Sequence, residues 1–212
     1  MSAPNLTTGR GGVAASYSDG QLARAIRYGI DSEGKTLIFM PTAEHTWWPD
    51  EDLLALLSYI RSVRPVDREV APTSVGLLGK VLSRFGVMEL ESAKAINNVP
   101  DGQAPAPEPT ARYGAFLAIG CKGCHGDGFS GGKIPGAPAI LATPANLTPH
   151  ESGLLAWTID DFINLLETGA RPDGRLLDPF LPIQSLKAMN ETEKTALWAY
   201  LRTLEPTEFG QR

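Results

Sequence analysis

Two parts of this 212-residue chain repeat one another, and this repeat constrains the fold more than any other feature. The matching segments lie 140 or 141 positions apart, so residues 5–66 and 146–207 are two copies of one unit. The clearest matches are Asn5-Leu6-Thr7 with Asn146-Leu147-Thr148, Gly34-Lys35 with Gly174-Arg175, Pro41 with Pro182, and Tyr59-Ile60-Arg61 with Tyr200-Leu201-Arg202. Copies of one unit are expected to adopt the same local structure.

Each copy predicts a shorter and a longer amphipathic helix, separated by a loop that contains glycine and proline. Polar N-cap residues precede three of these helices, and glycine or proline ends all four. The helices expected are residues 19–27 and 53–60 in the first copy and 159–167 and 190–201 in the second, with caps at Ser18, Thr158 and Asn190 and ends at Gly29, Pro65, Gly169 and Pro206. The sequence therefore predicts an all-α fold of two tandem lobes.

The segment between the two copies differs from both. Residues 75–90 predict a short amphipathic helix, and residues 97–110 contain several prolines, as expected for an extended connector without its own core. We therefore divide the chain into a first lobe, residues 1–70, a linker, residues 71–110, and a second lobe, residues 111–212.

Composition removes several functional classes. The formal net charge is −5, whereas nucleic-acid-binding proteins normally carry a basic surface, so no nucleic-acid partner is expected. No stretch of about 18 apolar residues occurs, so no membrane span is predicted in this chain. The chain has 2 cysteines, which excludes a scaffold of several disulfides. No catalytic triad, phosphate loop or catalytic carboxylate pair is recognised, so we do not expect an enzyme.

The cysteines belong to a C-x-x-C-H motif, Cys121, Cys124 and His125, at the end of a short amphipathic helix. Two thiols separated by one turn of chain can add to the two vinyl groups of a haem, and the following imidazole then binds the iron. The other ring nitrogen of such a histidine needs a hydrogen-bond acceptor, and we expect the backbone carbonyl of Pro135 or Pro138 to supply it.

The motif admits three other interpretations. A zinc site would use the same three residues, but adjacent Cys and His fit poorly on one tetrahedral ion, and His45 and His150 lack metal-finger spacing. A thioredoxin-like redox pair would need a βαβ setting, which the sequence does not indicate. The remaining alternative is two buried thiols beside a surface histidine. Covalent haem attachment is the favoured interpretation.

The second lobe resembles a class I cytochrome c lobe, of the kind found in multi-haem cytochromes c and in cytochrome subunits of periplasmic dehydrogenases. Residues 112–207 carry the resemblance. Its matching segments are Gly114 to Ala118, Cys121 to Gly126, Gly131-Gly132, Ile134 to Gly136, Ala145 to Pro149, Trp157 to Phe162, Thr168-Gly169 and Ala199 to Arg202.

The resemblance implies one covalently bound haem c in residues 111–212, with thioether bonds to Cys121 and Cys124 and with His125 on the iron. By the same analogy, Asn146 hydrogen-bonds a haem propionate and Trp157 packs on the haem. Attachment of this kind requires export, so a periplasmic location is expected even though no leader is visible at the N-terminus.

The second iron ligand departs from the family pattern. Such lobes usually supply a methionine from a Met-Pro step before the last helix, and the first copy has this step at Met40. The aligned residue in the second copy is Leu181, which cannot bind iron. Met189 is the other candidate, although it aligns with Trp48 and its alternative role is core packing. If Met189 does not bind the iron, the second axial position has no protein ligand and is either open or occupied by water.

The first copy has the opposite defect, since it has Met40 but no C-x-x-C-H motif. The equivalent motif would fall before residue 1, so we expect a lobe cut off upstream of its haem site, as in a fragment of a two-haem cytochrome. Met40 would then bind iron only if a haem occupies the first lobe. The alternative is a haemless lobe retained for docking.

The function expected from the resemblance is one-electron transfer in a periplasmic redox chain. The expected partners are redox proteins, namely a dehydrogenase, an oxidase or another cytochrome. Two alternatives remain open. One is a haem protein whose open iron binds gases or catalyses a reaction, and the other is a haem lobe joined to a docking module of a dehydrogenase complex.

Overall fold

The computed structural model describes residues 3–38, 40, 42–71, 76–77, 79, 81, 85, 104–135, 141–178, 181 and 183–212. The chain divides into a first unit, residues 1–103, and a second unit, residues 104–212. Over the described residues the regular structure is helical, and β pairing is limited to isolated bridges, which confirms the predicted all-α class. The same residues include no helix with the length and apolar character that a membrane crossing requires.

The boundary between the units falls between Gln103 and Ala104. Much of the expected linker, residues 71–110, and of the helix expected at residues 75–90 lies outside the described residues. The finer division at residues 70 and 110 therefore stays a prediction.

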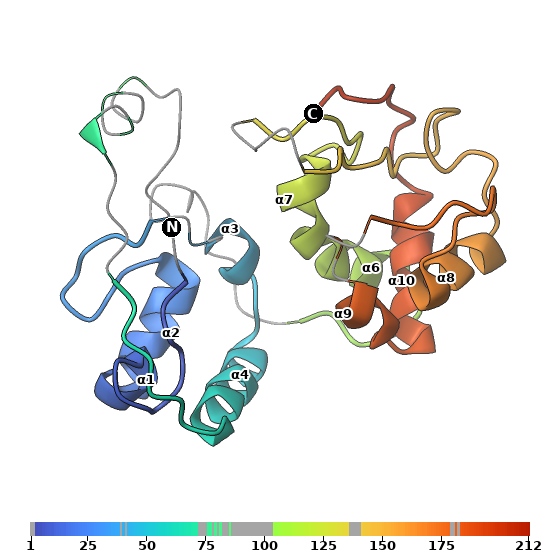
Figure 1. Ribbon diagram of the computed structural model, residues 1–212. Helices are drawn as coiled ribbons and strands as arrows, with labels where there is room; N and C mark the ends of the chain where they lie inside the picture. The colour runs from blue at the N-terminus through green and yellow to red at the C-terminus, as the bar shows by residue number, and fades with distance from the viewer. Residues whose placement is uncertain are drawn as a thin grey trace. The chain divides into compact units, whose positions relative to one another are not determined.

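The first unit contains the helices that its sequence copy predicts (Figure 1). Its described helices are α1 (Val13–Ser16), α2 (Asp19–Tyr28), α3 (Thr42–His45) and α4 (Asp50–Ser62). Ser18 caps α2 in a capping box with Gln21, because each side chain accepts a hydrogen bond from the other residue's backbone N–H. The helix ends at Gly29, whose φ of 61° is left-handed. The predicted start and end of α2 are thus confirmed.

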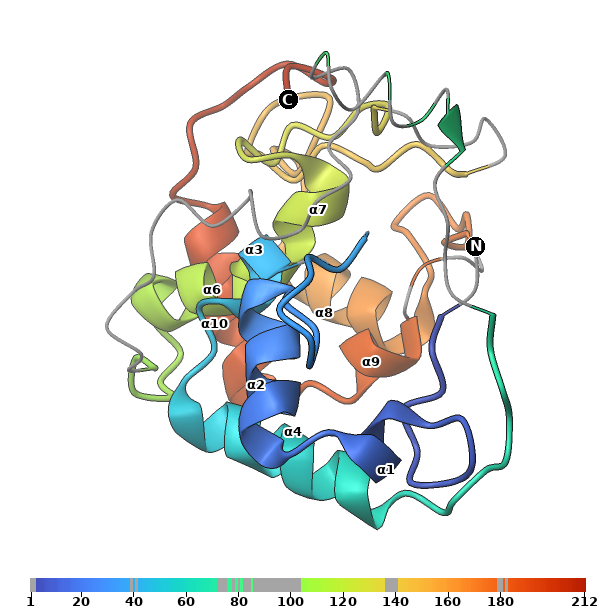
Figure 2. The same cartoon turned by 90° about the vertical axis from the view of Figure 1, so that its left-hand side faces the viewer.

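Side chains from α1, α2 and α4 form the core of the first unit. In both views α1 lies next to the start of α2 (Figures 1 and 2). The buried residues of this core are Ala14, Leu22, Leu53, Leu57 and Ile60. Arg61 of α4 connects this helix to α1 and α2, because it donates to the carbonyls of Ala14 and Tyr17 and forms an ion pair with Asp19.

The second unit begins with three short consecutive helical segments and ends with a longer helix. Its segments are α6 (Ala111–Leu117), the 3-10 turn η2 (Ala118–Cys121), α7 (Lys122–His125), α8 (Ile159–Thr168), α9 (Ile183–Lys187) and α10 (Glu191–Leu201). The predicted caps Thr158 and Asn190 each form a capping box, with Asp161 and Glu193 respectively. α6 packs closely against α10 at Gly114, where a Cβ atom would overlap the carbonyl oxygen of Ala196.

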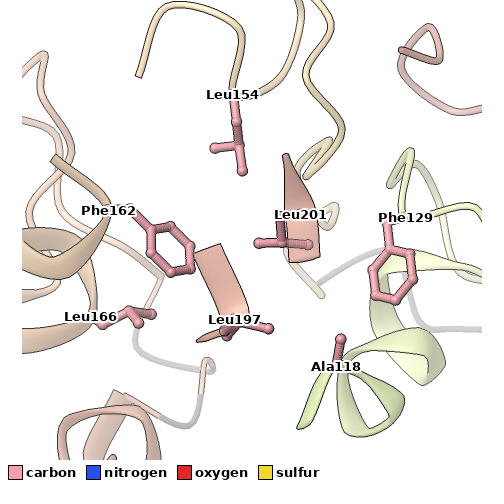
Figure 3. Packing of buried hydrophobic residues seen from close by; sticks show 7 residues of the cluster. All are labelled: Ala118, Phe129, Leu154, Phe162, Leu166, Leu197 and Leu201. Carbon is pink, nitrogen blue, oxygen red and sulfur yellow. The ribbon is translucent and has the colours of Figure 1, made fainter. Parts of the chain in front are cut away.

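The core of the second unit is larger and joins η2, α8 and α10. Figure 3 shows its buried side chains directed toward one another from η2, α8, α10 and the intervening loops. They are Ala118, Phe129, Leu154, Phe162, Leu166, Leu197 and Leu201. Burial of a side chain such as Leu or Phe contributes roughly 1.5–3 kcal/mol, so this cluster supplies much of the unit's stability.

Equivalent residues of the two sequence copies make the same hydrogen bonds. In each unit an asparagine oxygen accepts two bonds from a threonine two residues later, and its amide donates to a carbonyl that follows α4 or α10. The sets are Asn5, Thr7 and Val66 in the first unit and Asn146, Thr148 and Thr207 in the second. The loop after the shorter helix also repeats, because Leu37 donates to Gly29 as Leu177 donates to Gly169.

Candidate functional site

The two cysteines of the motif lie one turn apart at the end of the first helical segments of the second unit. Cys121 ends η2 and packs against the core, whereas Cys124 belongs to α7 and is exposed. The short helix predicted before the motif is present but divided, since a 3-10 turn separates α6 from α7. Gly120 and Gly123 have low helix propensity, which favours this interruption. The two thiols are not joined in a disulfide.

His125 is held by a backbone carbonyl. Its Nδ1 donates to the carbonyl oxygen of Ala145 at 2.8 Å. Burial lowers the pKa of His125 most, the bond to Ala145 opposes this shift, and the charge of Arg212 adds to it. A neutral ring that donates from Nδ1 carries its lone pair on Nε2, which is the form that binds a metal.

The acceptor of this hydrogen bond differs from the one that the sequence predicts. The carbonyl of Ala145 takes the place expected for Pro135, and Pro138 lies outside the described residues. A backbone carbonyl is present at every residue, so composition gives no signal for which one faces the ring. The path of the chain after His125 determines which carbonyl faces the ring.

That path depends on two consecutive glycines. Gly131 donates to the carbonyl of His125 at 2.9 Å, and Gly132 donates to the carbonyl of Pro144 at 3.0 Å. Gly131 has a φ of 71°, and a Cβ atom there would overlap the carbonyl oxygens of both Pro144 and Ala145. Glycine therefore allows the loop after the motif to approach the segment whose carbonyl orients His125.

Asn146 lies directly after Ala145 and is buried. Its Oδ1 accepts from the backbone N–H and the hydroxyl of Thr148, and its Nδ2 donates to Ser152 and to the carbonyl of Thr207. These four bonds use the capacity of the side-chain amide, so the structure gives Asn146 a role in holding the loop. The expected bond to a propionate stays a prediction that this geometry does not support.

Trp157 lies at the edge of the second core and is partly buried. The guanidinium carbon of Arg171 is 5.7 Å from the centroid of its ring, which is a cation–π distance. Packing of Trp157 on a haem stays a prediction.

The two candidate methionines for the second iron ligand, Met189 and Met40, belong to different units, and Leu181 belongs to the second unit. Met189 is partly buried, packs against the second core and directly precedes the N-cap Asn190 of α10. Leu181 is also partly buried, and Met40 belongs to the first unit. Both alternatives for the second lobe, Met189 on the iron and an iron without a protein ligand on that side, stay predictions.

The alternative interpretations of the motif gain no support from the described residues. Over the described ranges, no group of three or more His, Cys, Asp or Glu side chains is arranged to hold a metal ion, as a zinc site would require. A thioredoxin-like pair would follow a strand, and the part of the chain that the structure describes has isolated bridges only.

Known proteins that resemble the chain include cytochrome subunits. The fructose dehydrogenase cytochrome subunit of Gluconobacter japonicus is 31% identical over 108 residues, which cover 47% of this chain and 22% of that protein. The cytochrome c subunit of alcohol dehydrogenase (quinone) from Gluconobacter oxydans is 28% identical over 102 residues, 45% of this chain and 21% of that protein. One of the subunits of nicotinate dehydrogenase from Pseudomonas putida is 33% identical over 93 residues, 41% of this chain and 8% of that protein.

The chain is related to cytochrome c subunits of dehydrogenases. It spans about a fifth of the length of two of these relatives and less of the third. No protein-family model matches the sequence.

Proposed function

We propose that the chain is a c-type cytochrome that transfers single electrons through one covalently bound haem c in residues 111–212. Cys121 and Cys124 would form the thioether bonds, and His125 would bind the iron. The observation that carries the proposal is the fixed ring of His125. This residue directly follows two cysteines that lie one turn apart, and its Nδ1 donates to the carbonyl of Ala145. The related cytochrome subunits support the same function.

The haem, when bound, supplies a one-electron couple between ferric and ferrous iron. The residues of the chain would attach the haem, orient it and exclude water from its surroundings. The bond from His125 to Ala145 fixes the tautomer and the rotation of the ring. The apolar core against which Cys121 packs lowers the local polarity, which is one of the protein's means of setting a reduction potential. No bond of a substrate is made or broken, so the chain is proposed as an electron carrier and not as an enzyme.

We further propose that the two units are tandem cytochrome c-like lobes, the first without its attachment motif. The equivalent hydrogen bonds of Asn5 and Asn146 support this relationship. Met40 would bind iron only if a haem occupies the first lobe. The proposed partners are a dehydrogenase, an oxidase or another cytochrome, and the proposed location is the periplasm, where such haem attachment follows export.

Covalent haem attachment is tested by producing the exported chain in a host that matures c-type cytochromes. We expect the mass of the polypeptide plus one haem, and a reduced visible spectrum typical of haem c that persists after denaturation and acid–acetone extraction. The variant in which Cys121 and Cys124 are both replaced by serine serves as the control and should lose the haem on extraction. A colourless wild-type protein whose two thiols react with an alkylating reagent would exclude the proposal.

An open iron is a second candidate, and Leu181 favours it because leucine stands where the first copy has Met40. If the iron lacks a protein ligand on that side, carbon monoxide shifts the spectrum of the reduced protein. The variant Leu181→Met should then reduce this response, since a thioether competes with the gas. A wild-type spectrum unchanged by the gas, together with its change on Met189→Leu, would instead assign Met189 as the ligand.

A further inference from the structure

The last residues of the chain return to the haem-attachment motif. Thr207 accepts hydrogen bonds from Asn146 Nδ2 at 2.7 Å and from Thr148 Oγ1 at 3.0 Å through its backbone carbonyl. Gly210 donates to the carbonyl of Ser130 at 3.0 Å. Residues 207–212 therefore lie against the loop that follows His125 and the segment that follows Ala145, and in Figure 1 the C-terminus lies beyond the end of α7.

Close backbone approach shows that this contact is a packed one. A Cβ atom on Gly132 would lie 2.7 Å from Cα of Gly210, and a Cβ atom on Gly126 would lie 3.2 Å from Cβ of Arg212. The tail thus lies directly on the glycine-rich loop that follows His125, and a side chain on Gly132 would displace it.

Arg212 contacts the attachment motif itself. Its Nη1 donates to the carbonyl of Cys124 at 2.7 Å and to the carbonyl of Gly132 at 3.1 Å, and its Nη2 lies 3.4 Å from the carbonyl of Gly123. The carbonyls of Gly123 and Cys124 are at the end of α7, where a helix leaves carbonyl groups unsatisfied. A guanidinium group suits this place because its planar fork reaches several carbonyls at once.

We propose that Arg212 is a positioning residue of the haem site, which clamps the attachment motif and whose charge raises the reduction potential of the iron bound by His125. This inference rests on the proposed haem attachment. Two physical effects carry it. The bonds to Cys124 and Gly132 join α7 to the loop that follows it, and the positive charge disfavours the ferric state, which carries one more positive charge than the ferrous state.

Arg212 differs from the other charges close to the motif. Lys122 lies 3.8 Å from the carboxylate of Asp127, so the two opposite charges compensate one another in part. Arg212 instead bonds to the backbone carbonyls of the motif and of the loop that follows it. Its charge is therefore fixed at the attachment motif.

The inference is tested on the matured, haem-loaded chain with Arg212→Gln, Arg212→Lys and the control Arg112→Gln. Arg112 is an exposed arginine at the start of α6, so its replacement removes the same charge from the same unit. The reduction potential is measured by redox titration of the visible spectrum. Exchange of the backbone amide of Gly131, which bonds to the carbonyl of His125, is measured by hydrogen–deuterium exchange.

We expect Arg212→Gln to lower the reduction potential relative to both wild type and Arg112→Gln. We also expect it to speed exchange at Gly131 by roughly tenfold, since a hydrogen bond from a charged group contributes enough to change local opening by that factor. Arg212→Lys keeps the charge but not the fork, so it should retain most of the potential and still exchange faster than wild type.

The inference is overturned if either measurement on Arg212→Gln matches wild type, or if Arg112→Gln lowers the potential by as much. Loss of haem from the wild-type protein is a different result, which would overturn the proposed function. The two failures are therefore distinguishable. The exchange measurement also reports on the clamp without any reference to electron transfer.

Discussion

At the scale of single residues, the geometry around His125 depends on backbone groups more than on side chains. The ring is fixed by the carbonyl of Ala145, and Gly131 brings the loop after the motif against that segment. Asn146 then holds the same segment through four hydrogen bonds of its own side chain. A change at Gly131 should therefore act on the histidine although the two residues are not adjacent in the chain.

We predict that Gly131→Ala destabilises the second unit and disturbs His125. The new methyl group would meet the carbonyl oxygens of Pro144 and Ala145, and the φ of 71° is unfavourable for alanine. The free energy of unfolding should fall by about 1–3 kcal/mol, as expected for a strained backbone position. Urea denaturation measures this change. The matched control is Gly128→Ala in the same loop, where the nearest atom to the added Cβ is 4.0 Å away, and an equal loss there would contradict the explanation.

At the scale of helices, the sequence predicted those helix boundaries that depend on a polar N-cap side chain or on a terminal glycine. Ser18, Thr158 and Asn190 are N-caps as predicted, and Gly29 and Gly169 end their helices in left-handed conformation. The short helices α1, α3 and α9 were not predicted, because four or five residues are too few to show a periodicity. The acceptor for His125 was predicted wrongly, since a backbone carbonyl leaves no trace in the sequence.

The two equivalent capping boxes predict a difference in pH dependence between the units. Asp161 completes the capping box of α8, and hydrogen bonds from the backbone N–H and then the hydroxyl of Thr158 lower its pKa below the ordinary value of an aspartate. A carboxyl whose pKa is lower in the folded state stabilises the fold above its unfolded pKa, and this contribution is lost as the pH falls through the folded value. In the first unit Gln21 occupies the same position and does not titrate.

We therefore expect the backbone amides of α8 to lose protection from hydrogen exchange, relative to those of α2, when the pH is lowered below about 4. Asp161→Asn should remove this part of the pH dependence and weaken α8 at neutral pH. Asp160→Asn, one residue earlier and outside the capping box, is the matched control. Equal acid sensitivity of α8 in the wild type and in Asp161→Asn would show that the cap is not responsible. Asp173 also has a lowered pKa because of its hydrogen bond to Arg175. Asp161→Asn should therefore reduce the acid sensitivity of the second unit without abolishing it.

At the scale of the whole molecule, the chain consists of two units that each have their own core. Leu22 and Phe162 occupy equivalent places in the sequence repeat, each on the buried face of the helix that follows the first cap. The proposed chemistry, by contrast, is confined to the second unit. The same structural role is thus filled twice, whereas the proposed haem-attachment motif lies in the second unit.

This arrangement predicts that the units lose stability separately. Leu22→Ala should destabilise the first unit by about 2–5 kcal/mol, and Phe162→Ala should destabilise the second by about 3–5 kcal/mol, because both changes leave cavities in a core. Hydrogen exchange resolved by peptide should show lost protection in α2 and α4 for the first variant and in α8 and α10 for the second. Leu22→Ala should also keep its covalently attached haem after maturation, whereas Phe162→Ala should lower the yield of attachment. Loss of protection in both units from either single change would mean that the two cores unfold as one cooperative unit.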